Sequence, residues 1–408
     1  MDLNLESINI LIGSNSSGKS NFLKIFEFIR EIVDWGLENA ISRLGGPDYL
    51  LNINLKDRYP LKFYLLADLD WYIESEFEKN KIHIEYTDLD YEFEIKFNDN
   101  KFLIKKDILT LGLRVIQNDE DINKKDKKGQ KNPSFKLSYN KKEDNIAIDI
   151  KDEKGKILEE TSISNVTALK ILTNIINQAK KPINYNDLLI TNSISYAVIG
   201  LPLLSDIMIY DFDVKLITEA VPFLGFSDLE DDGSNLTIIL KNILDDEEES
   251  RKFYNLLNSI LPFLKTIQVE KFLDSSYFFK IKEIYSESYL PGSFSSEGTV
   301  AILALIVALY FEKFGIILIE EPGKLVHPYI ISKIVDFLLD ASSEKQIFIT
   351  THNPLLIKGI DLKSIFLVSR NKDGFSEISN LDNSERTKIF LKNELGIDDL
   401  FIENLLGE

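Results

Sequence analysis

The chain contains no cysteine in its 408 residues. Disulfide bonds, thiolate metal ligands and cysteine nucleophiles are therefore excluded. A long apolar run is also absent, because the longest one, residues 301–311, falls well short of the roughly 18 residues that cross a bilayer. The opening residues 1–6 lack a basic region, which argues against a secretory signal. These absences predict a cytoplasmic protein with no membrane partner.

An excess of positive charge is lacking as well, since the net charge is −19 and the isoelectric point is near 4.8. Nucleic-acid backbones are bound by clustered Lys and Arg, so a general affinity for DNA is not expected. One basic segment, residues 123–131, is the exception, and its lysines are Lys124, Lys125, Lys127, Lys128 and Lys131. No aromatic residues lie between them to stack on bases, which favours a solvated loop over contact with DNA.

The chain has no fixed-period repeat, no low-complexity tract and no sustained heptads. A solenoid and a long coiled-coil arm are therefore excluded. With 44% hydrophobic and 28% charged residues, the composition is that of a globular protein. At 408 residues the chain is longer than one compact core, so two or three lobes are expected.

A glycine-rich loop near the start of the chain is the most informative feature present. The sequence Gly13-Ser14-Asn15-Ser16-Ser17-Gly18-Lys19-Ser20 fits G-x-x-x-x-G-K-[ST], follows the apolar run 8–12 and precedes Asn21 and apolar positions with helical spacing over 22–33. In such a loop the backbone N–H groups surround phosphates, Lys19 adds positive charge and the Ser20 hydroxyl binds Mg²⁺. The segment therefore predicts a nucleotide site. Ser16 would cost stability if its position in the loop needs a positive φ.

Residues 61–111 alternate apolar and polar side chains, with a turn at 98–100. This period of two predicts an antiparallel meander with one solvated face. His83 lies in one such segment and is interpreted as a solvated strand residue. Residues 135–139 and 146–150, which follow the basic segment 123–131, have the pattern of hairpin strands.

The pattern becomes mainly helical from residue 162 to about 273. Its acidic run, Asp245–Glu249, has two interpretations, a metal cluster or the first turn of a helix. Apolar residues at helical spacing follow it over 253–264. Carboxylates in a first turn offset the helix dipole, so the second interpretation is favoured.

Three further motifs occupy residues 293–353. In the first, the turn Ser295–Thr299 opens a very apolar helix, and a turn of this kind at a helix N-terminus can bind an anion. In the second, four aliphatic residues at 316–319 predict a strand buried on both faces of a parallel sheet. Glu320 and Glu321 follow this strand at the end where α/β proteins bind ligands. Glu320 is placed to bind Mg²⁺, and Glu321 to orient or deprotonate an attacking water.

The third motif is the apolar strand 346–349 followed by Thr350, Thr351 and His352. His352 is interpreted as a donor to a γ-phosphate, and a structural histidine is the alternative. His327, which precedes Pro328, is expected to cap the next helix or to line a dimer interface.

Together and in this order, the four motifs resemble those of the ATP-binding-cassette class of P-loop ATPases. The chain looks in particular like the standalone "predicted ATPase" family with an AAA-labelled domain, a relative of SMC-like heads and of the OLD ATPases. The resemblance is strong over 1–35 and 290–370 and looser at 208–213 and 233–236. It implies an α/β fold, a P-loop NTPase head with an antiparallel β meander and a mixed, mainly helical insertion lobe. We expect the head to comprise residues 1–112 and 291–408, and the insertion to comprise 113–290.

The resemblance also implies roles for individual residues. Gly13–Ser20 is the Walker A loop, Glu320 the Walker B carboxylate, and Ser296–Thr299 the signature, with contacts to ATP from Ser296, Gly298 and Thr299. The implied catalytic residues are Lys19, Glu321 and His352. The implied cofactors are ATP and Mg²⁺, and two copies are expected to sandwich two ATP molecules as a homodimer.

Several positions depart from the family pattern. Ser16 replaces the usual glycine of the loop, Glu297 replaces a signature glycine, and Gly323 stands where the family prefers another glutamate. A Q-loop glutamine is assigned only by rough position, to Gln117, and no adenine-stacking aromatic is identified.

The expected function is a Mg²⁺-dependent ATPase that dimerises on ATP and couples this switch to a partner in DNA repair or antiviral defence. The residues after Val368 are too few for the nuclease domain of OLD-type relatives, so an effector such as a nuclease or toxin is expected to act in trans. An ATP-dependent scaffold or clamp with incidental turnover remains the alternative. A transporter subunit is disfavoured, because the meander and long insertion do not suit that compact design.

Overall fold

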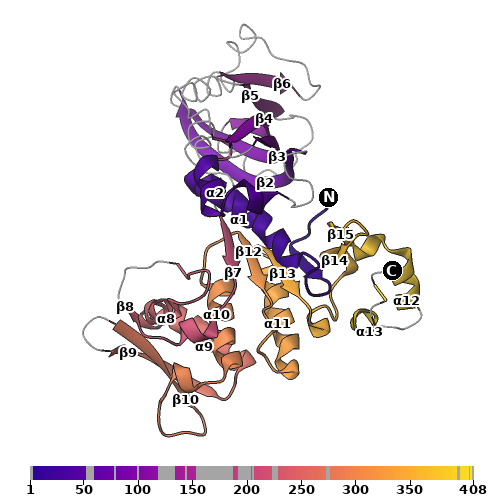
Figure 1. The fold of residues 1–408 in the computed structure, drawn as a ribbon. Coiled ribbons are helices and arrows are strands. Elements are labelled where there is room, and N and C mark those ends of the chain that lie inside the picture. The colour runs from indigo at the N-terminus through magenta and orange to yellow at the C-terminus, as the bar shows by residue number, and fades with distance from the viewer. Residues whose placement is uncertain are drawn as a thin grey trace, which may run out of the picture. The chain divides into compact units, whose positions relative to one another are not determined.

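The computed structural model describes residues 3–51, 59–77, 80–98, 101–117, 134–142, 145–152, 187–191, 204, 206–222, 228–272, 276–392, 396–403 and 405–406. The chain forms two compact units, Met1–Glu27 with Asp206–Glu408, and Phe28–Ser205 (Figure 1). The chain passes from the first unit to the second within helix α1 (Lys19–Trp35).

A six-stranded sheet forms the centre of the first unit. Its strands are β1 (Ile8–Ile12), β7 (Ile207–Tyr210), β12 (Ile316–Glu320), β13 (Gln346–Thr351), β14 (Ile365–Arg370) and β15 (Ser376–Asn380). Their spatial order is β15-β14-β1-β13-β12-β7, and every neighbouring pair is parallel except β14 and β15. The carboxyl ends of β1, β13 and β12 therefore meet at one edge, where the sequence motifs lie.

This sheet is buried on both faces, as the aliphatic runs predict. Phe348 of β13 packs against Phe22 and Phe26 of α1, with ring centroids 5.9 and 4.8 Å away. Its neighbours Ile347 and Ile349 point to the opposite face and join the main hydrophobic core. That core includes α10 (Glu297–Tyr310) and α11 (Pro328–Ala341). Helix α10 is apolar on all sides and is almost wholly buried, as such a helix requires.

In the described ranges, the rest of the first unit combines helices with short antiparallel strands. Its remaining elements up to residue 294 are α7 (Val214–Ile217), β8 (Val221–Pro222), α8 (Leu236–Asp245), α9 (Glu247–Ile260), β9 (Leu264–Phe272), β10 (Ser276–Glu283), β11 (Leu290–Pro291) and η2 (Gly292–Phe294). The acidic run is confirmed as a helix start, because Asp246 caps α9 by accepting from the backbone N–H groups of Glu248 and Glu249. The C-terminal part contains η3 (Pro354–Leu356), η4 (Leu362–Ser364), η5 (Leu381–Asn383), α12 (Glu385–Lys392) and α13 (Ile397–Ile402).

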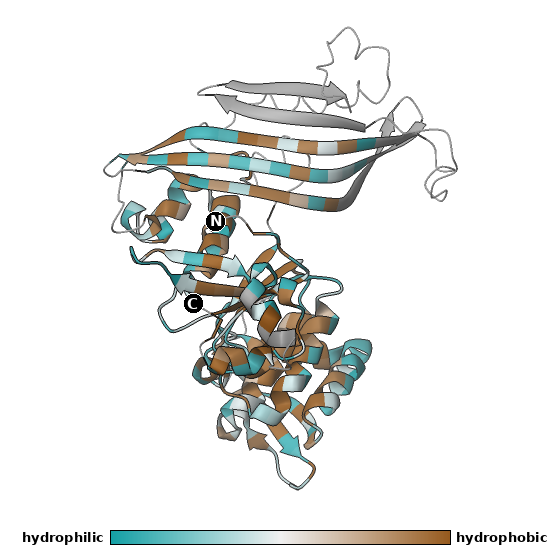
Figure 2. Cartoon of the chain, turned by 90° about the vertical axis from the view of Figure 1, so that its right-hand side faces the viewer, coloured by the Kyte–Doolittle hydropathy of each residue, from teal (hydrophilic) through white to brown (hydrophobic). Residues whose placement is uncertain are grey.

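The second unit is built on an antiparallel sheet of five strands in chain order. These are β2 (Leu61–Phe77), β3 (Asn80–Asn98), β4 (Lys101–Gln117), β5 (Ser134–Lys142) and β6 (Asn145–Asp152), accompanied by α2 (Leu37–Arg43) and α3 (Pro47–Leu50). Hydrophobic and hydrophilic residues alternate along its coloured strands in Figure 2. Tyr91 and Phe93 are fully buried, whereas Glu92 and Glu94 between and beyond them are only half-buried. The predicted meander with one solvated face is thus confirmed.

The division of the chain differs from the expected one. The meander and the following hairpin form one continuous sheet, so the expected boundary at 112 falls inside β4. Residues 206–290, which we assigned to the insertion, belong to the first unit with the nucleotide motifs. The sequence pattern could not show that the sheet continues past residue 112, because apolar and polar side chains alternate on both sides of that residue.

Some expectations concern residues outside the described ranges. The lysine-rich segment 123–131 lies there, as does most of the stretch 162–205, and the side chain of His83 is also not described. Among the described helices, none is both long enough and apolar enough to span a membrane.

Candidate active site

The loop Gly13–Ser20 connects β1 to α1. The side chain of Lys19 contacts the backbone of this loop. Lys19 Nζ donates to the carbonyl oxygens of Gly13 and Ser14, at 2.9 and 3.1 Å. Burial lowers the pKa of the Lys19 ammonium, an effect that the nearby Glu321 and Glu320 carboxylates oppose. Neutral carbonyls are weaker partners for an ammonium than anionic oxygens are. Lys19 is therefore placed to exchange them for a phosphate.

Three residues of this loop have positive φ, and one of them is Gly13 at φ 155°. Gly18 has φ 114° and Ser16 has φ 64°. The left-handed conformation costs an L-residue about 1 kcal/mol. Ser16 thus carries the strain that its replacement of glycine predicts. Buried hydroxyls of Ser17 and Thr350 lack hydrogen-bond partners among the described residues, which fits a region that receives a polar ligand.

Ser20 and Glu320 bring two oxygen ligands together. The Ser20 hydroxyl donates to Oε1 of Glu320 at 2.6 Å, although the residues are 300 positions apart. Mg²⁺ prefers such oxygens and completes its shell with water and substrate phosphates. No group of three His, Cys, Asp or Glu side chains in the described ranges could hold a metal alone. The donor set therefore fits a Mg²⁺ shared with a nucleotide.

Glu321 and His352 are in direct contact at the ends of β12 and β13. His352 Nδ1 lies 2.6 Å from Oε1 of Glu321. The other carboxylate oxygen, Oε2, accepts from Thr351 Oγ1 at 3.1 Å and from the His352 backbone N–H at 3.3 Å. Glu321 itself has φ 49°, and its N–H donates to the Thr350 carbonyl at 2.9 Å. The backbone thus turns sharply as β12 ends and directs this carboxylate toward β13.

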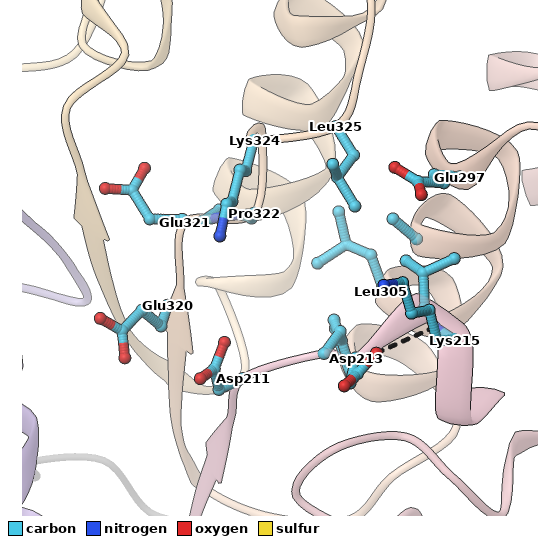
Figure 3. A pocket seen from close by; sticks show the side chains of 13 residues that line it. Asp211, Asp213, Lys215, Glu297, Leu305, Glu320, Glu321, Pro322, Lys324 and Leu325 are labelled. Carbon is cyan, nitrogen blue, oxygen red and sulfur yellow. Dashed lines mark hydrogen bonds between the residues drawn. The ribbon is translucent and has the colours of Figure 1, made fainter.

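A pocket of about 430 Å³ lies beside these carboxylates. Figure 3 shows Glu320 and Glu321 on one side of it with Asp211, and Glu297 and Leu325 on the other. Asp211 directly follows β7, the strand next to β12. This residue received no role from the sequence, because neighbouring strands in the sheet need not be neighbours in the chain.

The residues Ser296–Thr299 form the start of α10. Ser296 caps the helix, since its Oγ accepts from the Thr299 N–H at 3.2 Å and lies 2.8 Å from Thr299 Oγ1. A Cβ on Gly298 would lie 2.6 Å from the Leu325 carbonyl oxygen, so only glycine fits there. Glycine at this position lets α10 approach the segment that follows Glu321.

Two other residues that the sequence singled out, His327 and Gln117, lie elsewhere in the fold. His327 caps α11, with Nδ1 accepting from the Tyr329 N–H at 3.2 Å, so the capping interpretation is confirmed. Gln117 ends β4 of the antiparallel sheet, and its side chain is not described. Thr351 has no role that the sequence motif predicts. Its full burial beside Glu321 could only be known from the strand pairing.

A family model described as "AAA domain, putative AbiEii toxin, Type IV TA system" matches residues 8–358. No curated protein sequence matches the chain. The SmcHead bound to the C-winged helix domain of ScpA is a similar solved structure, with 12% identity, a TM-score of 0.40, and coverage of 92% of this chain and 91% of that one.

Two further SMC heads are similar at the same level. The Smc head domain with an extended coiled coil from Pyrococcus furiosus, bound to the C-terminal domain of ScpA, has 12% identity, a TM-score of 0.36, and coverage of 96% and 94%. The SMC head domain from Thermotoga maritima has 11% identity, a TM-score of 0.35, and coverage of 93% and 92%.

Proposed function

Because the chain belongs to this AAA-domain family, we propose that it is a Mg²⁺-dependent ATPase that dimerises on ATP and couples this switch to a partner protein. The observation that carries the proposal is the meeting of three motifs at one edge of the sheet. Lys19 and Ser20 follow β1, Glu320 ends β12 and is followed by Glu321, and His352 follows β13. Ser20 contacts Glu320, and Glu321 contacts His352.

Each residue has a task in hydrolysis that follows from its position. Lys19 and the loop N–H groups bind the β- and γ-phosphates, and Ser20 and Glu320 hold the metal. A Mg²⁺ ion held there by Ser20 and Glu320 would supply positive charge against the charge of the phosphates. Glu321 orients the attacking water and accepts its proton. The His352 backbone N–H holds the Glu321 carboxylate, and the single N–H of the neutral imidazole is donated to the γ-phosphate when ATP is bound.

We propose further that two copies assemble around ATP. Ser296, Gly298 and Thr299 sit at the start of α10, where backbone N–H groups attract an anion. In the described part of the chain, no hydrogen bond joins them to the loop Gly13–Ser20 of the same copy. They would contact the γ-phosphate bound by the second copy, which makes each site shared.

The output of this switch is proposed to act through a partner, a nuclease or toxin, in antiviral defence or DNA repair. The family description, which refers to a type IV toxin–antitoxin system, supports the first setting. Direct DNA contact rests only on the lysines of residues 123–131, and a gel shift that is absent or insensitive to salt would exclude it.

Phosphate release by the purified chain tests the proposal directly. Wild type with Mg²⁺ should turn over ATP, and Glu321→Gln should retain ATP binding while losing turnover. Light scattering should show that ATP converts Glu321→Gln to a dimer. Glu219→Gln, an exposed carboxylate outside the site, is the matched control. Unchanged phosphate release in Glu321→Gln would overturn the proposal.

A further inference from the structure

The hairpin formed by β14 and β15 contacts the outer side of the loop Gly13–Ser20. Arg370 Nε donates to the Ser16 carbonyl at 2.7 Å, and Ser376 Oγ donates to the Ser17 carbonyl at 2.7 Å. We infer that Arg370 and Ser376 are positioning residues that hold this loop in the conformation that accepts ATP. The inference rests on the proposed ATP binding, and it assigns a role to a hairpin that no sequence motif marks.

Arg370 is itself held on its other side. Its Nη1 donates to the Gly374 carbonyl at 2.9 Å. The turn that carries this carbonyl is closed by Asn371, whose Oδ1 accepts from the N–H groups of Asp373 and Phe375, both at 3.0 Å. The guanidinium therefore joins a well-bonded turn to the loop. Hydrogen bonds from a charged donor are stronger than those between neutral groups.

The carbonyl that Arg370 holds belongs to Ser16, the non-glycine residue of the loop with positive φ. A left-handed serine persists only where its surroundings determine it. Arg370 donates to the carbonyl of that residue. Its loss should therefore let Ser16 relax toward ordinary backbone conformations that distort the loop.

Ser376 determines the direction of a second peptide. In a trans peptide the C=O and the following N–H point in opposite directions. With the Ser17 carbonyl directed at Ser376, the Gly18 N–H must point away from the hairpin. The two segments also approach closely, because a Cβ on Gly18 would lie 2.2 Å from Ser376 Oγ. The hairpin thus directs the Gly18 N–H to the side of the loop where phosphate is expected.

Four carbonyls of the loop accept hydrogen bonds from side chains, and they fall into two classes. Those of Gly13 and Ser14 are bound by Lys19, which must release them when it binds a phosphate. Those of Ser16 and Ser17 are bound by the hairpin, which makes no such exchange. Among these side-chain restraints, those from Arg370 and Ser376 consequently persist while ATP is bound.

Steady-state hydrolysis and ATP titration of matched variants test this role. Arg370→Ala should raise the KM and Kd for ATP about tenfold while kcat stays within about twofold. Arg370→Lys, which keeps a charged donor, should lie between. Ser376→Ala should weaken ATP binding about threefold. The controls are Arg251→Ala, exposed on α9, and Ser379→Ala, exposed on β15, which should bind ATP as wild type does.

Rescue by glycine separates positioning from general stability. Glycine adopts positive φ freely, so adding Ser16→Gly to Arg370→Ala should recover most of the lost affinity. Absence of ATP binding in wild type would refute the proposed function itself. Normal ATP affinity in Arg370→Ala and Ser376→Ala, beside an active wild type, would refute this inference alone. If Arg370→Ala does not fold, Arg370→Lys and Ser376→Ala decide in the same way.

Discussion

Oε1 of Glu321 lies 2.6 Å from Nδ1 of His352, although 30 residues separate the two in the chain. The contact depends on the parallel pairing of β12 with β13, in which Glu320 is opposite Thr350. The next residue on each strand then lies at the same edge of the sheet. Glu321 turns toward β13 at φ 49°, which places its carboxylate between Thr351 and His352. A slip in this register would separate the proposed catalytic pair.

Thr351→Val should lower kcat about tenfold and leave the KM for ATP nearly unchanged. The change preserves shape but removes the hydroxyl that donates to Glu321 at 3.1 Å. Thr351 makes no hydrogen bond with the loop Gly13–Ser20 among the described contacts, so ATP binding should not suffer. Thr351→Ser retains the donor and serves as the control in phosphate-release measurements. Equal kcat for the Val and Ser variants would contradict this role for Thr351.

Ser16→Gly should raise the free energy of unfolding by about 0.5–1 kcal/mol. Glycine relieves the left-handed strain at φ 64°, and part of the gain is lost because glycine also frees the unfolded chain. Chemical denaturation without nucleotide measures the difference. Ser14→Gly, in the same loop but without positive φ, should instead be neutral or destabilising. A loss of stability in Ser16→Gly would show that Ser16 makes a compensating interaction.

Much of the site could be predicted from local patterns. The phosphate loop, the strand before Glu320 and the caps at Asp246 and His327 each depend on a few adjacent residues. Short sequence motifs are therefore enough to predict these features. The buried sheet could be predicted for the same reason. Short aliphatic runs without alternating polar residues are typical of strands that are buried on both faces.

Other features depend on contacts that leave no local pattern. Arg370 and Ser376 bind backbone carbonyls about 350 residues away, and any residue type supplies a carbonyl. Asp211 is brought beside Glu320 only by the order of the strands. The division of the chain was likewise set by strand pairing across residue 112, which sequence alternation does not reveal.

Gly298→Ala should destabilise the protein by about 1–3 kcal/mol. In an open helix the same change is stabilising, because alanine has the higher helix propensity. Here the new Cβ would lie 2.6 Å from the Leu325 carbonyl oxygen, and backbone on both sides cannot easily move. Thermal or chemical unfolding gives the sign. Glu297→Ala, exposed at the preceding position, is the control, and stabilisation by Gly298→Ala would mean that α10 and the Leu325 segment are not in close contact.

Glu312 is a buried carboxyl remote from the proposed chemistry, between the end of α10 and the start of β12. Burial raises its pKa to about 7, although the Leu229 N–H that donates to it at 3.0 Å acts in the opposite direction. Asp228 raises the pKa further, and Lys345 lowers it. Lys345 Nζ donates to the Glu312 backbone carbonyl. Burial lowers the pKa of the Lys345 ammonium. The folded protein therefore retains a proton on Glu312 at pH values where the unfolded chain has lost it.

Glu312→Gln should accordingly flatten the pH dependence of stability. Between the ordinary carboxyl value of 4.5 and the folded value of about 7, the folded state binds more protons, so stability falls as pH rises. For this one group the fall amounts to about 2–3 kcal/mol from pH 5 to pH 8. Glutamine keeps an acceptor for Leu229 and does not ionise, so the variant should gain most over wild type at pH 8. Urea denaturation across this range, with exposed Glu385→Gln as control, measures the difference, and parallel curves for wild type and Glu312→Gln would rule the effect out.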